Sequence, residues 1–265
     1  MRAILGAVIV LAACRIDRAP PPAKMAVVDT TVPAGPLGEA IRRGRGIMLA
    51  TRESLPDQVG NRLRCVSCHL DEGRRPEGTW VGVYARYPQY RSRSASIQLI
   101  EDRVNDCFER SLNGKALPAN SREMRDIVAY LWWLSRGVPV AEPPAKEASR
   151  FAGFRADTAG GRVLFGQQCA LCHGVSGEGS AAAPAVWGPQ SYNIGAGMAR
   201  ANSAAAFIRA NMPFAAPGTL TDQQALDVAA YIDSQHRPDF PAKAGDWPNG
   251  GAPPDLPYQV RAGRQ

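Results

Sequence analysis

Two short motifs in the sequence combine residue types that can bond to a metal-containing cofactor and ligate its metal. Each has two cysteines separated by two residues and followed at once by a histidine, CVSCH at 65–69 and CALCH at 169–173. Two thiols one turn apart can bond the vinyl groups of a haem, and the adjacent imidazole can reach its iron. A zinc site or a redox dithiol would not need that histidine twice. The sequence therefore predicts two covalently bound haem c groups, attached at Cys65, Cys68, Cys169 and Cys172, with His69 and His173 on the irons.

The N-terminus has the pattern of an export signal. Its stretch MRAILGAVIVLAAC has one basic residue and then twelve uncharged ones, which predicts a signal peptide at 1–13, too short to span a membrane as a mature helix. It ends in a Leu-Ala-Ala-Cys sequence that resembles the bacterial lipoprotein cleavage box, so Cys14 is expected to carry a lipid. The alternative is that Cys14 is discarded with the signal. On the first interpretation, the Pro-rich stretch 14–36 tethers a periplasmic lipoprotein to a membrane.

Charge is distributed unevenly along the chain, whose precursor carries a net +7. Residues 37–140 have 17 Lys and Arg against 12 Asp and Glu, a net +5, whereas residues 158–237 have 4 of each. A basic first half and a neutral second half favour an anionic partner that meets the first half. Nucleic acid is not expected as that partner, because export removes the protein from it.

The elements around the two motifs also repeat. Helices are predicted at 121–136, with Asn120 as its cap, and at 220–234, where Thr221 and Gln224 form a capping box. They share nearly the same word, DIVAYLW and DVAAYID, and each motif follows another predicted helix, at 37–51 and 158–168. This order is typical of a class I cytochrome c domain. We therefore expect an all-α fold with two such domains, at 37–140 and 158–240, a Pro-rich linker at 141–157 and a Pro/Gly-rich tail at 241–265.

Counting from each histidine predicts the sixth ligand of each iron. A class I domain supplies this ligand from the loop before its last helix, and Met212 lies there, 39 residues after His173. Cys107 lies at nearly the same distance, 38 residues after His69, so we predict that it binds the first iron as a thiolate. The alternatives are that Cys107 is a packed or free thiol, and that Met198 takes the place of Met212.

The two ligand sets predict haems of different reduction potential. Methionine with histidine raises the potential, whereas an anionic thiolate stabilises ferric iron. The chain would thus hold a low-potential centre in its basic half and a higher-potential centre in its neutral half. Because cysteine sulfur also forms adducts with other sulfur compounds, such a pair suits an enzyme of sulfur chemistry better than a plain electron carrier.

Three longer stretches resemble the dihaem thiosulfate dehydrogenases of the TsdA family. They are RVNDCFERSLNGKAL around Cys107, VWGPQSYNIGAGMARANSAAAFIRANMPF with LTDQQALDVAAYI near Met212, and DWPNGGAPPDLPY in the tail. The resemblance covers roughly residues 37–258, and the Cys107 motif is its most diagnostic part. The first half is also similar to SoxA, which shares the His/Cys haem but lacks the second half. Family members often have a lysine before the distal methionine that can exchange with it, and here that residue is Asn211.

The resemblance implies that the chain couples two thiosulfates into tetrathionate and passes electrons through both haems to an external cytochrome. The outer sulfur of one thiosulfate would bond to Cys107, and a second thiosulfate would release the product. Joining two dianions requires nearby positive charge, for which we expect Arg91, Arg93 and Arg103; the alternative for each is a haem propionate or solvent. Rival functions are tetrathionate reduction at the same site, electron transfer alone by a membrane-tethered dihaem cytochrome, and a SoxA-like subunit that loads a carrier protein.

Overall fold

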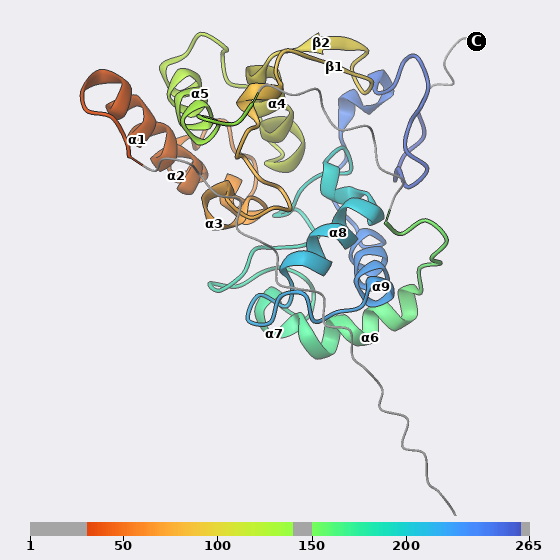
Figure 1. Ribbon diagram of the computed structural model, residues 1–265. Helices are drawn as coiled ribbons and strands as arrows, with labels where there is room; N and C mark the ends of the chain where they lie inside the picture. The colour runs from red at the N-terminus through yellow and green to blue at the C-terminus, as the bar shows by residue number, and fades with distance from the viewer. Residues whose placement is uncertain (1–30, 140–149, 261–265) are drawn as a thin grey trace, which may run out of the picture.

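The computed structural model describes residues 31–139 and 150–260, and these form two helical domains, one above the other in Figure 1. The predicted signal peptide at 1–13 and the lipid-bearing Cys14 lie outside these residues, as does most of the linker. Within the described ranges, no helix is at once long enough and apolar enough to cross a membrane.

The first domain surrounds the first cysteine motif. Its helices are α1 (Gly35–Leu49), α2 (Thr51–Ser54), α3 (Leu70–Gly73), α4 (Ile100–Asp106), a π-helix (Cys107–Ser111) and α5 (Arg122–Leu134), with 3-10 turns at Cys65–Ser67 and Tyr84–Arg86. A small antiparallel hairpin, β1 (Gln89–Arg91) with β2 (Ser96–Gln98), is the exception to the predicted all-α fold. Strands of three residues are too short to leave a clear period-2 pattern in the sequence.

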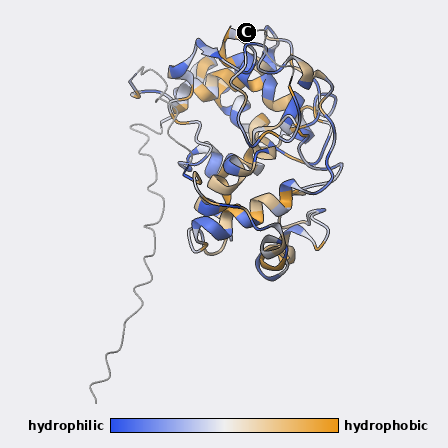
Figure 2. Ribbon diagram, turned by 90° about the vertical axis from the view of Figure 1, so that its right-hand side faces the viewer, coloured by the Kyte–Doolittle hydropathy of each residue, from blue (hydrophilic) through white to orange (hydrophobic). Residues whose placement is uncertain are grey.

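The second domain repeats the arrangement around the second motif. It consists of α6 (Thr158–Gln168), α7 (Ala170–His173), α8 (Ala201–Asn211) and α9 (Asp222–Asp233), with 3-10 turns at Gly197–Ala199 and Pro241–Gly245. The mostly helical fold with two cytochrome c-like domains agrees with the prediction. In Figure 2 the helices carry both hydrophobic and hydrophilic residues, as expected of helices that bury only one face.

Side-chain caps fix where α5, α6 and α9 begin. Thr221 accepts a hydrogen bond from Gln224 N, and the Gln224 side chain accepts one from Thr221 N, so the predicted capping box is present. The prediction of Asn120 as the α5 cap is wrong by one residue. Ser121 has the extended backbone of a cap, and its hydroxyl accepts from Met124 N at 3.1 Å. Asp157 caps α6 by accepting from two backbone N–H groups.

The two domains share one helix crossing that depends on a glycine. A Cβ atom on Gly44 of α1 would lie 1.9 Å from the backbone oxygen of Asp126 in α5. In the second domain, a Cβ atom on Gly161 of α6 would lie 2.0 Å from the backbone oxygen of Asp227 in α9. Asp126 and Asp227 begin the two copies of the repeated word, so the sequence repeat corresponds to the same close backbone contact in both domains.

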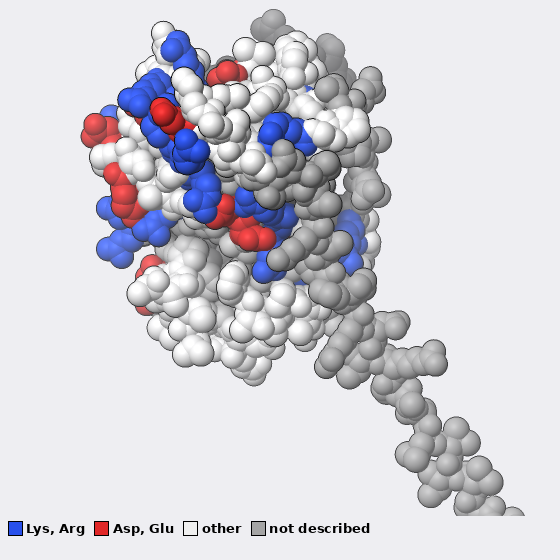
Figure 3. All heavy atoms as spheres, turned by 60° about the vertical axis from the view of Figure 1, so that its left-hand side comes forward, with Lys and Arg blue, Asp and Glu red and all other residues white. Residues whose placement is uncertain are grey.

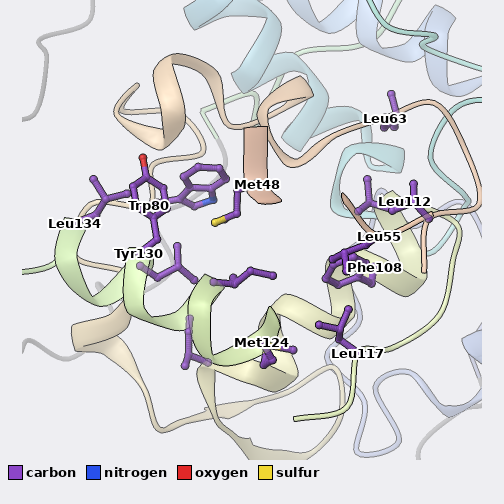
Figure 4. Close-up of a cluster of buried hydrophobic side chains, with 14 of the residues drawn as sticks. Met48, Leu55, Leu63, Trp80, Phe108, Leu112, Leu117, Met124, Tyr130 and Leu134 are labelled. Atoms are coloured by element: carbon purple, nitrogen blue, oxygen red, sulfur yellow. The ribbon is translucent and has the colours of Figure 1, made fainter. Parts of the chain in front are cut away.

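Two apolar clusters form the cores, and the first includes residues of both halves of the chain. Around the first motif, Met48 and Trp80 lie side by side, and Phe108 packs near Leu112 and Leu117 (Figure 4). Three residues from the second half, Tyr192, Ala196 and Ala199, are buried in this same cluster. The first domain is therefore completed by a segment that follows the second cysteine motif.

The predicted linker and tail are packed onto the domains where the structure describes them. Of the linker, residues 150–157 are described, and Phe151 is buried in the second core. The tail leaves α9 and runs up to the β1–β2 hairpin (Figure 1), where Trp247 N donates to Arg93 O at 2.7 Å. Asp246 and Trp247 are both buried, so this part of the tail is a structural element.

Candidate haem sites and the Cys107 cavity

The first cysteine motif opens onto a cavity of about 540 Å³, which is within the usual range for a small-molecule or cofactor site. Cys65, Cys68 and His69 line the cavity, and so does Cys107 from the end of α4. The structure therefore brings together the haem-attachment residues of this motif and Cys107, the sixth ligand predicted from the sequence.

His69 is oriented for binding through one ring nitrogen. Its Nδ1 bonds to the backbone oxygen of Gly78, which leaves Nε2 for the iron. The Trp80 ring lies against the imidazole, with ring centroids 4.9 Å apart. The orientation of the ring is thus fixed from two sides by residues that follow the motif.

The thiols of the first motif have the environment of attachment residues. Burial raises the pKa of both Cys65 and Cys68 to about 12, and the described cysteines form no disulfide. Thr51 donates from its hydroxyl to the Cys65 sulfur at 3.3 Å and accepts from Cys65 N at 3.0 Å. Two unpaired thiols and a ring nitrogen at one cavity fit a covalently attached haem c.

The second motif repeats this geometry. His173 Nδ1 bonds to the backbone oxygen of Pro184 at 2.8 Å, so Nε2 is again the nitrogen left for the iron. Burial raises the pKa of Cys169 to about 11, while Cys172 is exposed. Met212 directly follows α8 and packs, partly buried, against the second core. The two cysteines and His173 fit a second haem c, and Met212 remains the predicted sixth ligand.

Met198 belongs to the first cavity. It lines this cavity together with Ser203 and Phe207 of α8, and it packs against both cores. Met212 packs against the second core and is absent from the lining of this cavity, so Met198 is the methionine of the two that faces the first cavity. Because α8 also packs against α9 and places Ile208 in the second core, this helix connects the first cavity with the second core.

Cys107 differs from the attachment cysteines in its electrostatic environment. Arg103, one turn earlier on α4, donates from Nη1 to the Cys107 sulfur at 3.0 Å. Burial alone would raise the pKa of Cys107, but Arg103 and His69 outweigh this effect and lower it to about 7. The guanidinium beside the sulfur thus favours a thiolate despite the burial, and the thiolate is the form that binds iron and attacks sulfur. The π-helix begins at this residue, and such irregular turns are frequent at functional sites.

The predicted arginines divide into two groups. Arg91 and Arg103 line the cavity. Arg93 lies outside its lining and donates to the backbone oxygen of Gly195 at 2.9 Å, with its guanidinium over the Trp247 ring. Arg86 lines the cavity and was missed, although it belongs to the same basic stretch, RYPQYRSR at 86–93. Arg91 ends β1 and Arg93 lies in the turn that follows, so this turn, which the sequence did not reveal, separates Arg93 from the cavity.

Basic side chains gather on the first domain. In Figure 3 groups of Lys and Arg, with some Asp and Glu among them, lie on the upper part of the visible face, whereas the lower part, which belongs to the second domain, is almost entirely uncharged. This pattern agrees with the net charge of +5 over residues 37–140 and zero over residues 158–237.

Comparison with known proteins gives one consistent result. Residues 57–140 match the family model "SoxA/TsdA, cytochrome c domain", and residues 158–236 match the cytochrome c model. The chain is 43% identical to the thiosulfate dehydrogenase of Psychrobacter arcticus over 86% of this chain and 72% of the relative, and 42% identical to that of Allochromatium vinosum over 81% and 84%.

A solved structure supports the same assignment. Thiosulfate dehydrogenase (TsdBA) from Marichromatium purpuratum, in its "as isolated" form, superposes with a TM-score of 0.72 at 35% identity. The superposition covers 84% of this chain but only half of that longer chain. With two cysteine motifs, paired histidines and a cavity that holds Cys107, the chain belongs to the TsdA family of thiosulfate dehydrogenases.

Proposed function

We propose that the chain joins two thiosulfates into tetrathionate at the Cys107 sulfur. One observation carries this proposal most directly: the partly buried contact of 3.0 Å between Arg103 and the Cys107 sulfur, inside a cavity that also holds the attachment residues of the first haem. A thiolate beside a guanidinium can attack sulfur and attract an anion at the same place.

The reaction balances in two steps. In the first, the outer sulfur of one thiosulfate bonds to the Cys107 sulfur, and the pair of sulfurs loses two electrons. In the second, the outer sulfur of another thiosulfate attacks this adduct, and the bond to Cys107 breaks as its electron pair returns to the cysteine. Tetrathionate leaves, and Cys107 is again a thiolate.

Arginines offset the repulsion between the two dianions. Arg103 lies against the reacting sulfur, and Arg86 and Arg91 are the further cationic side chains that we assign to substrate. Guanidinium groups bind oxyanions through paired N–H donors, so they can hold the sulfonate end while the outer sulfur faces Cys107.

The first haem would be held by Cys65, Cys68, His69 and Cys107, and the second by Cys169, Cys172, His173 and Met212. When bound, the two haems supply acceptors for one electron each and a route to an external cytochrome. His/Cys ligation gives the first centre the lower potential, and His/Met ligation gives the second the higher.

The location of the protein is a further part of the proposal. The signal-like sequence and the Cys14 box support a periplasmic protein that is anchored to a membrane by an N-terminal lipid. Metabolic labelling with a fatty acid tests this, because a Cys14→Ser variant should lose the label and leave the membrane fraction.

An assay in both directions tests the reaction. Purified holoprotein is given thiosulfate with ferricyanide, or tetrathionate with a reduced dye, and tetrathionate is measured. Thiosulfate-dependent reduction of ferricyanide that Cys107→Gly abolishes is the expected result. A holoprotein active only with tetrathionate would be a reductase that uses the same site, and one inactive in both assays would be an electron carrier.

A further inference from the structure

The π-helix that carries Cys107 depends on partners outside itself. A helix of five residues, Cys107–Ser111, leaves several backbone carbonyls without a partner in the same helix. Because unpaired buried carbonyls are costly, these groups determine what the helix must touch. The carbonyls of residues 107 and 108 accept from backbone N–H groups just beyond the helix, those of Leu112 and Gly114, each at 2.9 Å.

The next three carbonyls are bonded by two asparagines. Asn193, in the second half of the chain, donates from Nδ2 to Glu109 O at 2.9 Å and from its backbone N to Arg110 O at 3.1 Å. Asn61 donates from Nδ2 to Ser111 O at 2.9 Å. Both asparagines are almost fully buried, at 1% and 2% exposure, so water does not replace these bonds.

Each asparagine is itself held in place. Asn61 Nδ2 also donates to Ser191 O at 2.9 Å, and this bond connects the first domain to the segment that leads to Asn193. The Asn193 side-chain oxygen accepts from Gly195 N at 3.0 Å, which fixes its amide so that Nδ2 faces the π-helix.

The tail holds the same helix through a side chain. Arg110, 9% exposed, donates from both terminal nitrogens to Asp246, each at 2.8 Å. Its guanidinium also lies 4.1 Å from the centroid of the Phe240 ring. The Tyr258 hydroxyl donates to the same carboxylate. Backbone and side chain of the π-helix are therefore both bound by residues that follow the second haem motif.

We infer that Asn193 and Asp246 are positioning residues for Cys107, which fix the direction of its sulfur by holding the π-helix from the second domain and the tail. Neither residue lines the cavity, so neither touches substrate or the first haem. The inference goes beyond the reaction proposed above and depends on one part of it, the binding of iron by Cys107. It gives the second domain a role at the reacting sulfur in addition to electron transfer.

The test uses full-length holoprotein with Asn193→Asp. This change keeps the shape and the backbone donor but replaces Nδ2 by an oxygen that faces Glu109 O. We expect the low-spin thiolate EPR signal of the first haem to lose at least half its intensity, its potential to shift, and kcat to fall at least tenfold. The methionine charge-transfer band of the second haem should be unchanged.

A second variant and a matched control separate positioning from loss of stability. Asp246→Asn keeps the shape and removes the charge that Arg110 binds, so it should weaken the same thiolate signal and decides the matter if Asn193→Asp does not fold. Asp157→Ala removes the cap of α6, far from the π-helix in the second domain, and should lower the melting temperature without changing that signal.

Two results would overturn the inference. Folded Asn193→Asp and Asp246→Asn proteins with the thiolate signal and potential of the wild type would show that the contacts of these two residues with the π-helix do not position Cys107. A wild type that lacks the thiolate signal would overturn the ligand assignment as well. Wild type with the signal but without activity would contradict only the proposed reaction.

Discussion

Arg103 of α4 donates to the sulfur of Cys107, the first residue of the π-helix that follows, four residues later and 3.0 Å away. Both side chains line the cavity, so the cation that stabilises the thiolate also faces the space where a thiosulfate would bind. One contact thus serves two requirements of the reaction, a nucleophilic sulfur and an offset for the charge of its anionic substrate.

Replacing Arg103 by Gln should therefore lower kcat/KM for thiosulfate about 10- to 100-fold, because a charge-assisted hydrogen bond of this kind contributes about 1.5–3 kcal/mol. Steady-state kinetics with ferricyanide measures the change. Arg122→Gln, which removes one exposed arginine of the same domain, is the control and should stay within about twofold of the wild type. Equal losses of kcat/KM in both variants would mean that only the net charge of the domain matters, and would contradict a specific role for Arg103 at the sulfur.

Cys107→Met separates a ligand from a reactant. Methionine can occupy the sixth position but cannot carry a covalent thiosulfate, so the protein should show a six-coordinate first haem and no tetrathionate formation. Visible spectra and the ferricyanide assay test the two properties on one sample. Near-wild-type turnover in this variant would sink the covalent mechanism and leave the haem assignments intact.

Met212→Gly should abolish the methionine charge-transfer band of the second haem and slow the transfer of electrons to an external acceptor. Reduction of the first haem by thiosulfate in a single turnover should persist, because the Cys107 cavity is unchanged. Met198→Leu is the matched variant, and we expect it to keep the band, since Met198 lines the first cavity. Loss of the band in Met198→Leu alone would reverse the assignment.

The helix crossing predicts opposite effects for two glycines of α1. Gly44→Ala should destabilise the protein by about 2–3 kcal/mol, because its Cβ would meet the backbone of α5 at 1.9 Å. Gly46→Ala, two residues along the same helix, has nothing within 4 Å of its Cβ and should stabilise by about 0.5–1 kcal/mol. Chemical unfolding measures both. Similar effects of the two changes would show that α1 does not cross α5 at Gly44.

The lowered pKa of Glu72 predicts that the stability of the fold decreases at acid pH. Arg45 and then Arg74 bond its carboxylate, which lowers its pKa from 4.5 to about 2. A carboxylate with a lowered pKa stabilises the folded state above pH 4.5, and this contribution disappears as the pH falls toward 2. Glu72→Gln should therefore be about 2 kcal/mol less stable than the wild type at pH 7. The difference in free energy of unfolding should vanish near pH 2, and a constant difference would contradict the assignment.

Much of this fold follows from short-range patterns. The α6 helix occupies the predicted range, Thr158–Gln168, because Asp157 caps it and a cysteine motif follows directly. The place of Cys107 at the cavity was predicted by counting residues from each histidine, since both domains were expected to place the sixth ligand at a similar distance from it. Spacing within one domain is local information, and a repeat allows one copy to be checked against the other.

The missing parts are contacts between distant segments. No pattern near Asn193 indicates that its amide caps a π-helix 84 residues earlier, and nothing near Asp246 indicates an ion pair with Arg110. Arg93 was expected at the substrate because of its charge. It lies in the turn after β1, and its guanidinium contacts the Trp247 ring of the tail instead. Such pairings depend on how the two domains dock, which the sequence of either domain does not specify.

Part of the lining of the first cavity comes from the second half of the chain, and this bears on the order in which the protein matures. Asn61 meets Ser191 across 130 residues and Arg110 meets Asp246 across 136, separations that slow the closing steps of folding. A chain made from its N-terminus exposes the first cysteine motif before Met198 and Phe207, which line the cavity, have been made. Haem attachment at the first site can therefore occur while the pocket is still open on one side, and the later docking of the second half would close it.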